Sequence, residues 1–384
     1  MRFFGDHSHT DSRIRAVATV GSDLLQALVF DTAGLSKAPK AIKKYSWKLP
    51  PNFSPDKRIE RLHGLLYTIL RELHAVPESI LIGIGSSVGT YSFETITVRP
   101  TEQKPLRVED YFRDIRQTRF SAQRCELVVP LTYSVNGYRL DEFRDFLKQQ
   151  PVLPSPDSVS ASFVGIFFKF DPAVCTQLIG LEKSWGGMPI FFIPAIVTLY
   201  SALQHLDTSD DGMIMEIGGD ETSVLLFRQK EIIAYTTFPF GRLQFMQAIA
   251  RTLNISLEEA EDVHEQYMEG IGTKGGNQEF LTKALSDQAD GWYTAFVHAL
   301  DAFYTAGPIS GALYLTGSGG RISQVHRHLL ESDWLKKFSP LDEVKLRTLN
   351  AEEIFGGDSL DGNLCGPADF ALAALMKYQI HNER

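Results

Sequence analysis

Residues 212–223 read GMIMEIGGDETS and hold the pattern that decides the fold. The apolar run Met213–Ile217 predicts a strand, and the glycines after it predict a turn. Further strands are expected over Thr222–Phe227 and Glu231–Phe238. Glycine lets a backbone approach a bound anion closely, and the N–H groups of such a turn form an anion-binding nest. The stretch therefore predicts an antiparallel meander whose first turn suits a phosphate.

The same layout occurs near the N-terminus. Ile14–Val20 predicts a strand, Gly21 begins a turn, and Leu24–Asp31 and Ala41–Leu49 predict two further strands. Gly21 and Gly218 then hold the same place in two copies that lie 197 residues apart (218 minus 21). The layout taken alone also fits two unrelated meanders, because antiparallel meanders are common.

A third glycine-containing turn, TGSGG at residues 316–320, follows the apolar strand Ala312–Leu315. The hydroxyl groups of Ser22, Thr222 and Ser318 add hydrogen-bond donors to the three turns. One such turn is most often only a β-turn. Three of them, in two similar halves and with the third before a helix, form a much more specific signal for a phosphate-binding site.

Residues 88–187, between the two meanders, are predicted to form a separate α+β unit. Its expected elements are strands at Thr95–Val98, Glu126–Val129 (ending at Pro130) and Ala161–Phe170, and helices at Val108–Thr118 and Leu140–Gln149. Farther along the chain, a helix is predicted over Ser256–Tyr267, because Ser256 and Glu259 have the spacing of a capping box.

Composition excludes several classes of protein. Of the 384 residues, 43% are hydrophobic and 22% charged, which is typical of a folded chain and not of a disordered one. The net charge of -9 argues against a nucleic-acid partner, because such binding depends on lysine and arginine. The most apolar stretch, Met188–Leu203, is too short to span a bilayer. We therefore expect a cytoplasmic protein without direct membrane insertion.

The three cysteines, Cys125, Cys175 and Cys365, are far apart and odd in number. This distribution does not predict a disulfide framework and favours a reducing compartment. The chain has no C-x-x-C or H-E-x-x-H motif, so we expect no structural zinc site and assign no metal-ligating residue.

The three turns together resemble the nucleotide-binding loops of the actin-like ATPase superfamily, which includes actin, the DnaK-type chaperones and hexokinase. Val20–Ser22 resembles the first phosphate loop, Glu216–Ser223 the second, and Thr316–Gly320 the adenosine-contacting loop. The segment Val129–Gly137 and the position of the inserted unit are similar to the FtsA/PilM-like branch, closest to the cell division protein FtsA. Ser256–Glu261 resembles the helix that borders the base in that branch.

The resemblance implies an α/β, actin-like fold of duplicated ribonuclease-H-like halves with an inserted α+β subdomain in the first half. The first half would comprise residues 1–87 and 188–207, and the inserted interaction subdomain residues 88–187. The second half would comprise residues 208–384 and include a helical subdomain at about 242–307.

The resemblance also implies an FtsA-like cytoskeletal scaffold that binds ATP and Mg²⁺ with weak or absent hydrolysis. It would form filaments or oligomers and link a cytoplasmic division protein to a membrane-associated complex at the inner face of the cell membrane. Glu216 would be the catalytic residue, positioning magnesium or water. The cofactor-binding residues would be Gly21, Ser22, Gly218, Gly219, Asp220, Glu221, Thr222, Glu261, Gly317, Ser318, Gly319 and Gly320.

The phosphate loops depart from the family pattern at several positions. Thr19 and Ser223 stand where aspartates are usual, and Glu216 replaces a third. Asp220 and Glu221 would add negative charge beside a polyanion, which should weaken a magnesium-nucleotide site. Three alternatives therefore remain: a PilM-like adaptor of type IV pilus assembly recruited by the cytoplasmic tail of a membrane protein, a pseudo-ATPase scaffold, and a sugar-kinase-type phosphotransferase.

Overall fold

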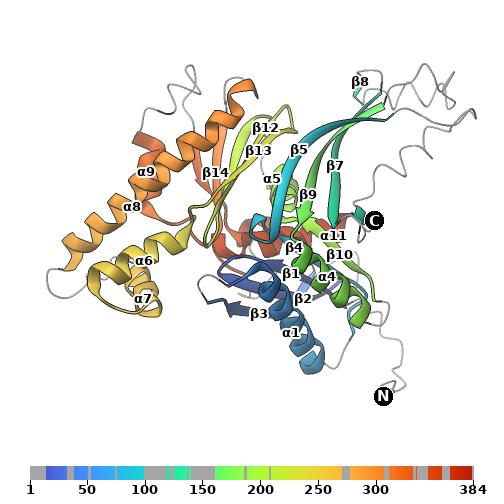
Figure 1. Ribbon diagram of the computed structural model, residues 1–384, viewed down its shortest axis with the longest axis horizontal. Helices are drawn as coiled ribbons and strands as arrows, with labels where there is room; N and C mark the ends of the chain where they lie inside the picture. Colours follow the sequence, from blue (N-terminus) through green and yellow to red (C-terminus); the bar gives the residue numbers. More distant parts are fainter. Residues whose placement is uncertain are drawn as a thin grey trace, which may run out of the picture.

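The computed structural model describes residues 14–32, 39–50, 53–73, 76–98, 119–121, 125–135, 138–139, 161–185, 188–206, 209–269, 277–306, 311–331, 334, 345–356 and 364–382. Three sheets and the helices around them make up this part of the chain (Figure 1). The helices predicted at Val108–Thr118 and Leu140–Gln149 lie outside the described residues.

The first sheet is built around the N-terminal meander. Its strands are β1 (Ile14–Val20), β2 (Leu24–Asp31), β3 (Lys40–Lys48), β4 (Ile80–Ile84) and β10 (Ile190–Pro194). The spatial order is β10-β4-β1-β2-β3, with antiparallel pairing through the meander and parallel pairing of β4 with β1 and β10.

The second sheet repeats this arrangement strand for strand. It contains β11 (Gly212–Ile217), β12 (Thr222–Arg228), β13 (Glu231–Phe238), β14 (Ala312–Thr316) and β15 (Lys345–Thr348). The order is β13-β12-β11-β14-β15, and the parallel and antiparallel pairs occur at the same places as in the first sheet. The duplication predicted from the two meanders is thus confirmed, and chance likeness is excluded.

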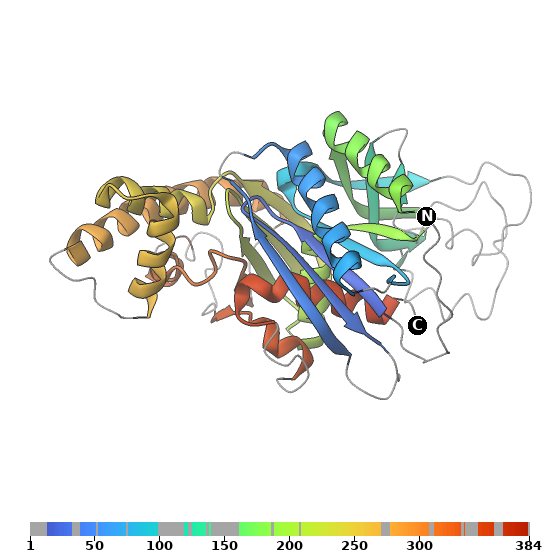
Figure 2. The ribbon, with the colours of Figure 1, turned by 90° about the horizontal axis from the view of Figure 1, so that it is seen from below.

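Two helices, α5 (Ala195–Leu206) and α11 (Phe370–Asn382), lie between the two sheets and pack against each other. One apolar core contains residues of both sheets and of these helices. On the other side of the first sheet lie α1 (Pro55–Leu73) and α4 (Pro172–Ser184). Figure 2 shows α1 and the red helix α11 on opposite sides of the first sheet. The boundaries proposed for the halves remain predictions.

Helices cover the outer face of the second sheet and form a second apolar core. They are α6 (Arg242–Leu253), α7 (Leu257–Met268), α8 (Asn277–Leu300), η3 (Asp301–Ala306) and α9 (Ser323–Glu331). The predicted capping box of α7 is confirmed: Ser256 Oγ accepts from the Glu259 amide at 3.2 Å, and Glu259 Oε2 accepts from the Ser256 amide at 2.8 Å. Within the described ranges, we find no helix whose length and apolar character would let it cross a bilayer.

The inserted unit contains an antiparallel sheet that stands beside the second half (Figure 1). Its strands are β5 (Gly89–Val98), β6 (Arg119–Ser121), β7 (Glu126–Val135), β8 (Tyr138–Arg139) and β9 (Ala161–Phe170). The strand predicted to end at Pro130 instead continues to Val135. A register shift between Pro130 and Thr132 makes this possible, because a bulge accommodates a residue that cannot donate to the ladder.

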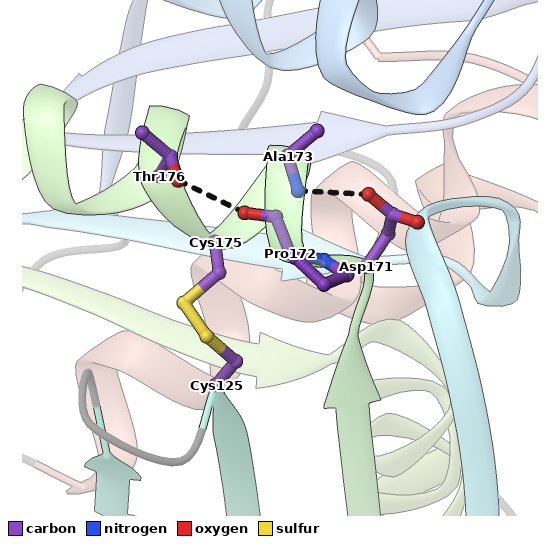
Figure 3. The surroundings of a disulfide bond; sticks show 6 residues. All are labelled: Cys125, Asp171, Pro172, Ala173, Cys175 and Thr176. Atoms are coloured by element: carbon purple, nitrogen blue, oxygen red, sulfur yellow. Dashed lines mark hydrogen bonds between the residues drawn. A yellow bond between two sulfur atoms is a disulfide. The ribbon is translucent and has the colours of Figure 1, made fainter.

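The cysteine prediction is wrong in one respect, because Cys125 and Cys175 form a disulfide (Figure 3). The Phe170 amide at the end of β9 donates to the Cys125 carbonyl at 2.9 Å, which brings the start of β7 beside the start of α4. The first turn of α4, capped by Asp171, then presents Cys175 to Cys125. Their Cα atoms are 5.6 Å apart although 50 residues separate them in sequence. Cys365 is a free, exposed thiol.

We predict that the disulfide stabilises the inserted unit by restricting its unfolded chain. Cys125→Ser should lower the free energy of unfolding of the oxidised protein by about 2–4 kcal/mol, measured by chemical denaturation. Cys365→Ser is the matched control and should leave the unfolding curve unchanged. Equal unfolding curves for the parent and Cys125→Ser under non-reducing conditions would contradict this prediction.

Candidate functional site

The first two predicted turns are built alike. The Gly21 amide donates to the Leu24 carbonyl at 3.0 Å, and the Gly218 amide donates to the Glu221 carbonyl at 2.9 Å. These four residues are related by the same offset of 197 that relates the two meanders. The duplication therefore extends to the hydrogen bond that closes each turn, and both turns face the space between the two halves.

The third turn is fixed directly onto the second. The Gly319 amide donates to the Ile217 carbonyl at 2.8 Å, and a Cβ at Gly319 would lie 2.4 Å from Ile217 Cγ2. Gly317 has a φ of 88°, a conformation that residues with a side chain rarely adopt. Glycines at these two positions therefore allow the close approach of two loops that are about a hundred residues apart in sequence.

A cavity of about 80 Å³ lies where the three turns meet. Of the predicted site residues, those that line it are Gly21, Ser22, Glu216, Gly218, Gly219, Glu221, Gly317 and Ser318. The other five are Asp220, Thr222, Glu261, Gly319 and Gly320. Among them, Thr222 is fully buried and bonds to core groups: its hydroxyl donates to the Phe240 carbonyl at 2.6 Å and accepts from the Trp292 indole at 3.0 Å. Thr222 therefore does not face the cavity.

Charged side chains form pairs that join the two halves. Arg242, the first residue of α6, donates to Asp23 of the first turn at 3.2 Å and to Glu261 of α7 at 2.9 Å. Lys48, at the end of β3, reaches Glu261 at 2.6 Å. Desolvation opposes ionisation of Glu261, but the hydrogen bond from Lys48 and the charge of Arg242 outweigh it and lower its pKa. Glu261 thus takes part in an ion-pair network that joins the two halves.

A second group of contacts also joins the halves. Arg58, in the first turn of α1, pairs with Asp220 at 3.2 Å and has a side chain only 6% exposed. The Asp220 amide donates to Ser22 Oγ at 2.9 Å, and Ser86 Oγ donates to Glu221. The two phosphate-loop candidates are therefore bonded to each other directly. Sequence reasoning missed Asp23, Lys48, Arg58, Ser86 and Arg242, because no spacing rule links residues that meet only across two halves.

The carboxyl groups of the site have perturbed acidity. Burial, and then the charge of Glu221, raises the pKa of Glu216 to about 7. Burial also raises the pKa of Glu221 to about 7, against the opposing effect of its hydrogen bond with Ser86. His264 of α7 is buried near Arg242, and desolvation followed by that positive charge lowers its pKa to about 4. The surroundings of Glu216, Glu221 and His264 therefore favour the neutral forms of these side chains.

The arrangement does not fit a magnesium nucleotide. Pockets that hold ligands of drug size enclose roughly 300–1,000 Å³, several times the volume of this cavity. The amides of Arg242 and Leu243, which could meet a phosphate at the start of α6, instead donate to the carbonyls of Gly218 and Gly219 at 2.8 and 2.6 Å. The side chains of Lys48, Arg58 and Arg242, which join the halves here, already pair with carboxylates.

Comparisons with known proteins identify the fold. No family model matches the chain, and no curated protein matches its sequence. Its structure is similar to a chain of a PilM-PilN type IV pilus biogenesis complex, with a TM-score of 0.60 and 15% identity over 94% of this chain and 98% of that one. It is also similar to MreB 5 of Spiroplasma citri bound to AMPPNP (TM-score 0.47, 9% identity, 97% and 99% coverage) and to EutJ of Carboxydothermus hydrogenoformans (0.44, 11%, 94% and 89%).

The likeness to the chain of the PilM-PilN complex extends over 94% of this chain. The protein has the actin-like ATPase fold, with duplicated ribonuclease-H-like halves and an inserted subdomain, in a form similar to PilM. The fold predicted from the three turns is thus confirmed. At this level of identity the likeness shows the fold alone, so the roles of individual site residues stay predictions.

We predict that Glu216, which is partly buried, makes stability depend on pH. Its pKa rises from 4.5 to about 7 on folding, so its stabilising contribution is complete below pH 4.5 and is lost as the pH rises through about 7. Glu216→Gln should therefore be about 2 kcal/mol more stable than the parent at about pH 8 and similar to it at about pH 5, measured by denaturation at both values. Glu258→Gln, on the exposed face of α7, is the control. A difference that does not depend on pH would contradict the assignment.

Proposed function

We propose that this protein is a scaffold of actin-like fold that works by binding other proteins and does not use a nucleotide. The observation that carries the proposal is the set of side-chain pairs that join the two halves where a nucleotide would enter. Asp23–Arg242 and Asp220–Arg58 each join one turn to the opposite half. A polyphosphate would have to displace both pairs and enlarge the cavity.

The specific role that we propose is that of a PilM-like adaptor. PilM, with which this chain shares its fold over nearly its whole length, was solved in a complex with PilN. By analogy, the partner here would be the cytoplasmic tail of a membrane protein, which would recruit the scaffold to the inner face of the membrane. We propose the inserted sheet (β5 to β9) as the surface for such contacts. The net charge of -9 supports a protein partner over a nucleic acid.

The second candidate is an FtsA-like scaffold of cell division. Of the segment that resembles FtsA, Val129–Gly137, the part Val129–Val135 lies in β7, an inner strand of the inserted sheet. This candidate requires ATP and magnesium in the cleft, with Glu216 positioning magnesium or water, and self-assembly into filaments. The two candidates therefore differ in two measurable properties: nucleotide binding and nucleotide-dependent polymerisation.

Titration calorimetry with ATP and magnesium separates the candidates. We predict no saturable binding by the parent at millimolar ATP, because the cationic groups of the cleft are already paired. Gly218→Asp, which adds a charge to the second turn, should then behave like the parent. Saturable binding that is lost in Gly218→Asp would instead favour the FtsA-like candidate.

The adaptor role is tested by capture from detergent-solubilised membranes, with and without ATP. We predict that a membrane protein with a cytoplasmic tail is recovered equally in both conditions and that ATP produces no sedimentable polymer. ATP-dependent sedimentation without capture of a membrane protein would contradict the adaptor role.

A further inference from the structure

Asp23 and Asp220 occupy equivalent positions in the two halves. The offset of 197 residues that relates the two meanders also relates these two aspartates. Each lies in the turn between the first two strands of its half, after the hydrogen-bonded glycine. The duplicated turns therefore present one carboxylate each toward the space between the halves.

Each aspartate pairs with an arginine of the opposite half, and the two pairs are built alike. Asp23 of the first half binds Arg242 of the second, and Asp220 of the second half binds Arg58 of the first, both at 3.2 Å. Both arginines lie in the first turn of the helix that follows the third strand of their meander, α6 and α1. The contacts are thus reciprocal, and the pairing follows the symmetry of the duplication.

Asp23 also lies where the three turns meet. Besides Arg242, its carboxylate accepts from Ser318 Oγ of the third turn at 3.4 Å. It packs directly on Gly219 of the second turn, where an added Cβ would lie 2.5 Å from Asp23 Oδ1. The Asp23 carboxylate, which belongs to the first turn, therefore contacts both the second and the third glycine-containing turns. This is the position that an external anion bound by all three turns would take.

The chemistry of the pairs favours internal carboxylates over an external anion. A guanidinium group binds carboxylate and phosphate by the same N–H donors, so Asp and phosphate compete for Arg242 and Arg58. The aspartates belong to the same chain, so their effective concentration is in the millimolar range or above. The side chains of Asp23 and Arg242 are only 16% and 18% exposed, which reduces screening of their attraction by solvent. A free polyphosphate must therefore displace partners that are already in place.

We propose that the two pairs Asp23–Arg242 and Asp220–Arg58, here called the acid–arginine clasp, substitute for a bound polyphosphate and exclude it from the cleft. The inference rests on the proposed nucleotide-independent function and names the residues that produce it. Asp23 contributes most of the exclusion, because it lies at the junction of the turns, whereas the Asp220 side chain is 37% exposed. Removing the two carboxylates frees two arginines for an external phosphate chain.

Binding of inorganic pyrophosphate and of ATP by Asp23→Ala, Asp220→Ala and the double variant tests the clasp. We expect the double variant to bind both ligands about tenfold or more tightly than the parent by calorimetry, with most of the gain present in Asp23→Ala. Asp210→Ala is the matched control, because Asp210 is a 70% exposed aspartate in a turn and pairs with Lys230 at 3.5 Å. It should bind neither ligand better than the parent.

The outcomes separate the clasp from the proposed function. Saturable ATP binding by the parent overturns both. If the parent binds no ATP, and folded variants with the parental circular dichroism spectrum bind pyrophosphate and ATP no better than the parent, the clasp alone is overturned. Asp23→Asn and Asp220→Asn keep the side-chain shape without the charge, and they carry the same test if an alanine variant does not fold. An equal gain in Asp210→Ala also overturns the clasp, because net charge would then explain the effect.

Discussion

The ion pairs between the duplicated halves are the interaction on which the rest of the structure depends. Two turns of the same construction face each other, and each carries a carboxylate that reaches an arginine across the gap. Because these charges lie partly out of water, each needs its partner to offset the cost of desolvation. The pairs thus join the halves at the turns, next to the cavity of about 80 Å³.

Two kinds of contact join the halves. The halves are joined on one side by α5 and α11, whose apolar side chains form one core with both sheets. They are joined on the other side by the polar contacts of the turns. The inserted sheet adds further contacts, because β5 and β7 pack against β13 of the second half.

The sequence predicted the features that local patterns encode. Strand periodicity and the glycines at 21, 218 and 317 gave the duplicated meanders and the three turns, and Ser256 with Glu259 gave the start of α7. Pairing between distant residues was not predictable. Cys125–Cys175 depends on the β7–β9 register, and Arg242–Asp23 depends on how the halves face each other. The continuation of β7 past Pro130 was not predicted, because a bulge depends on the pairing of two strands.

The central claim is that the halves stay closed without a nucleotide, and a distance measurement between them tests it most directly. Spin labels at Ser46→Cys on β3 and Glu265→Cys on α7, with Cys365→Ser to remove the free thiol, would report that distance by pulsed electron resonance. The account predicts one narrow distance distribution that millimolar ATP and magnesium leave unchanged. A broad distribution in the free protein, or a shift on adding ATP, would contradict it.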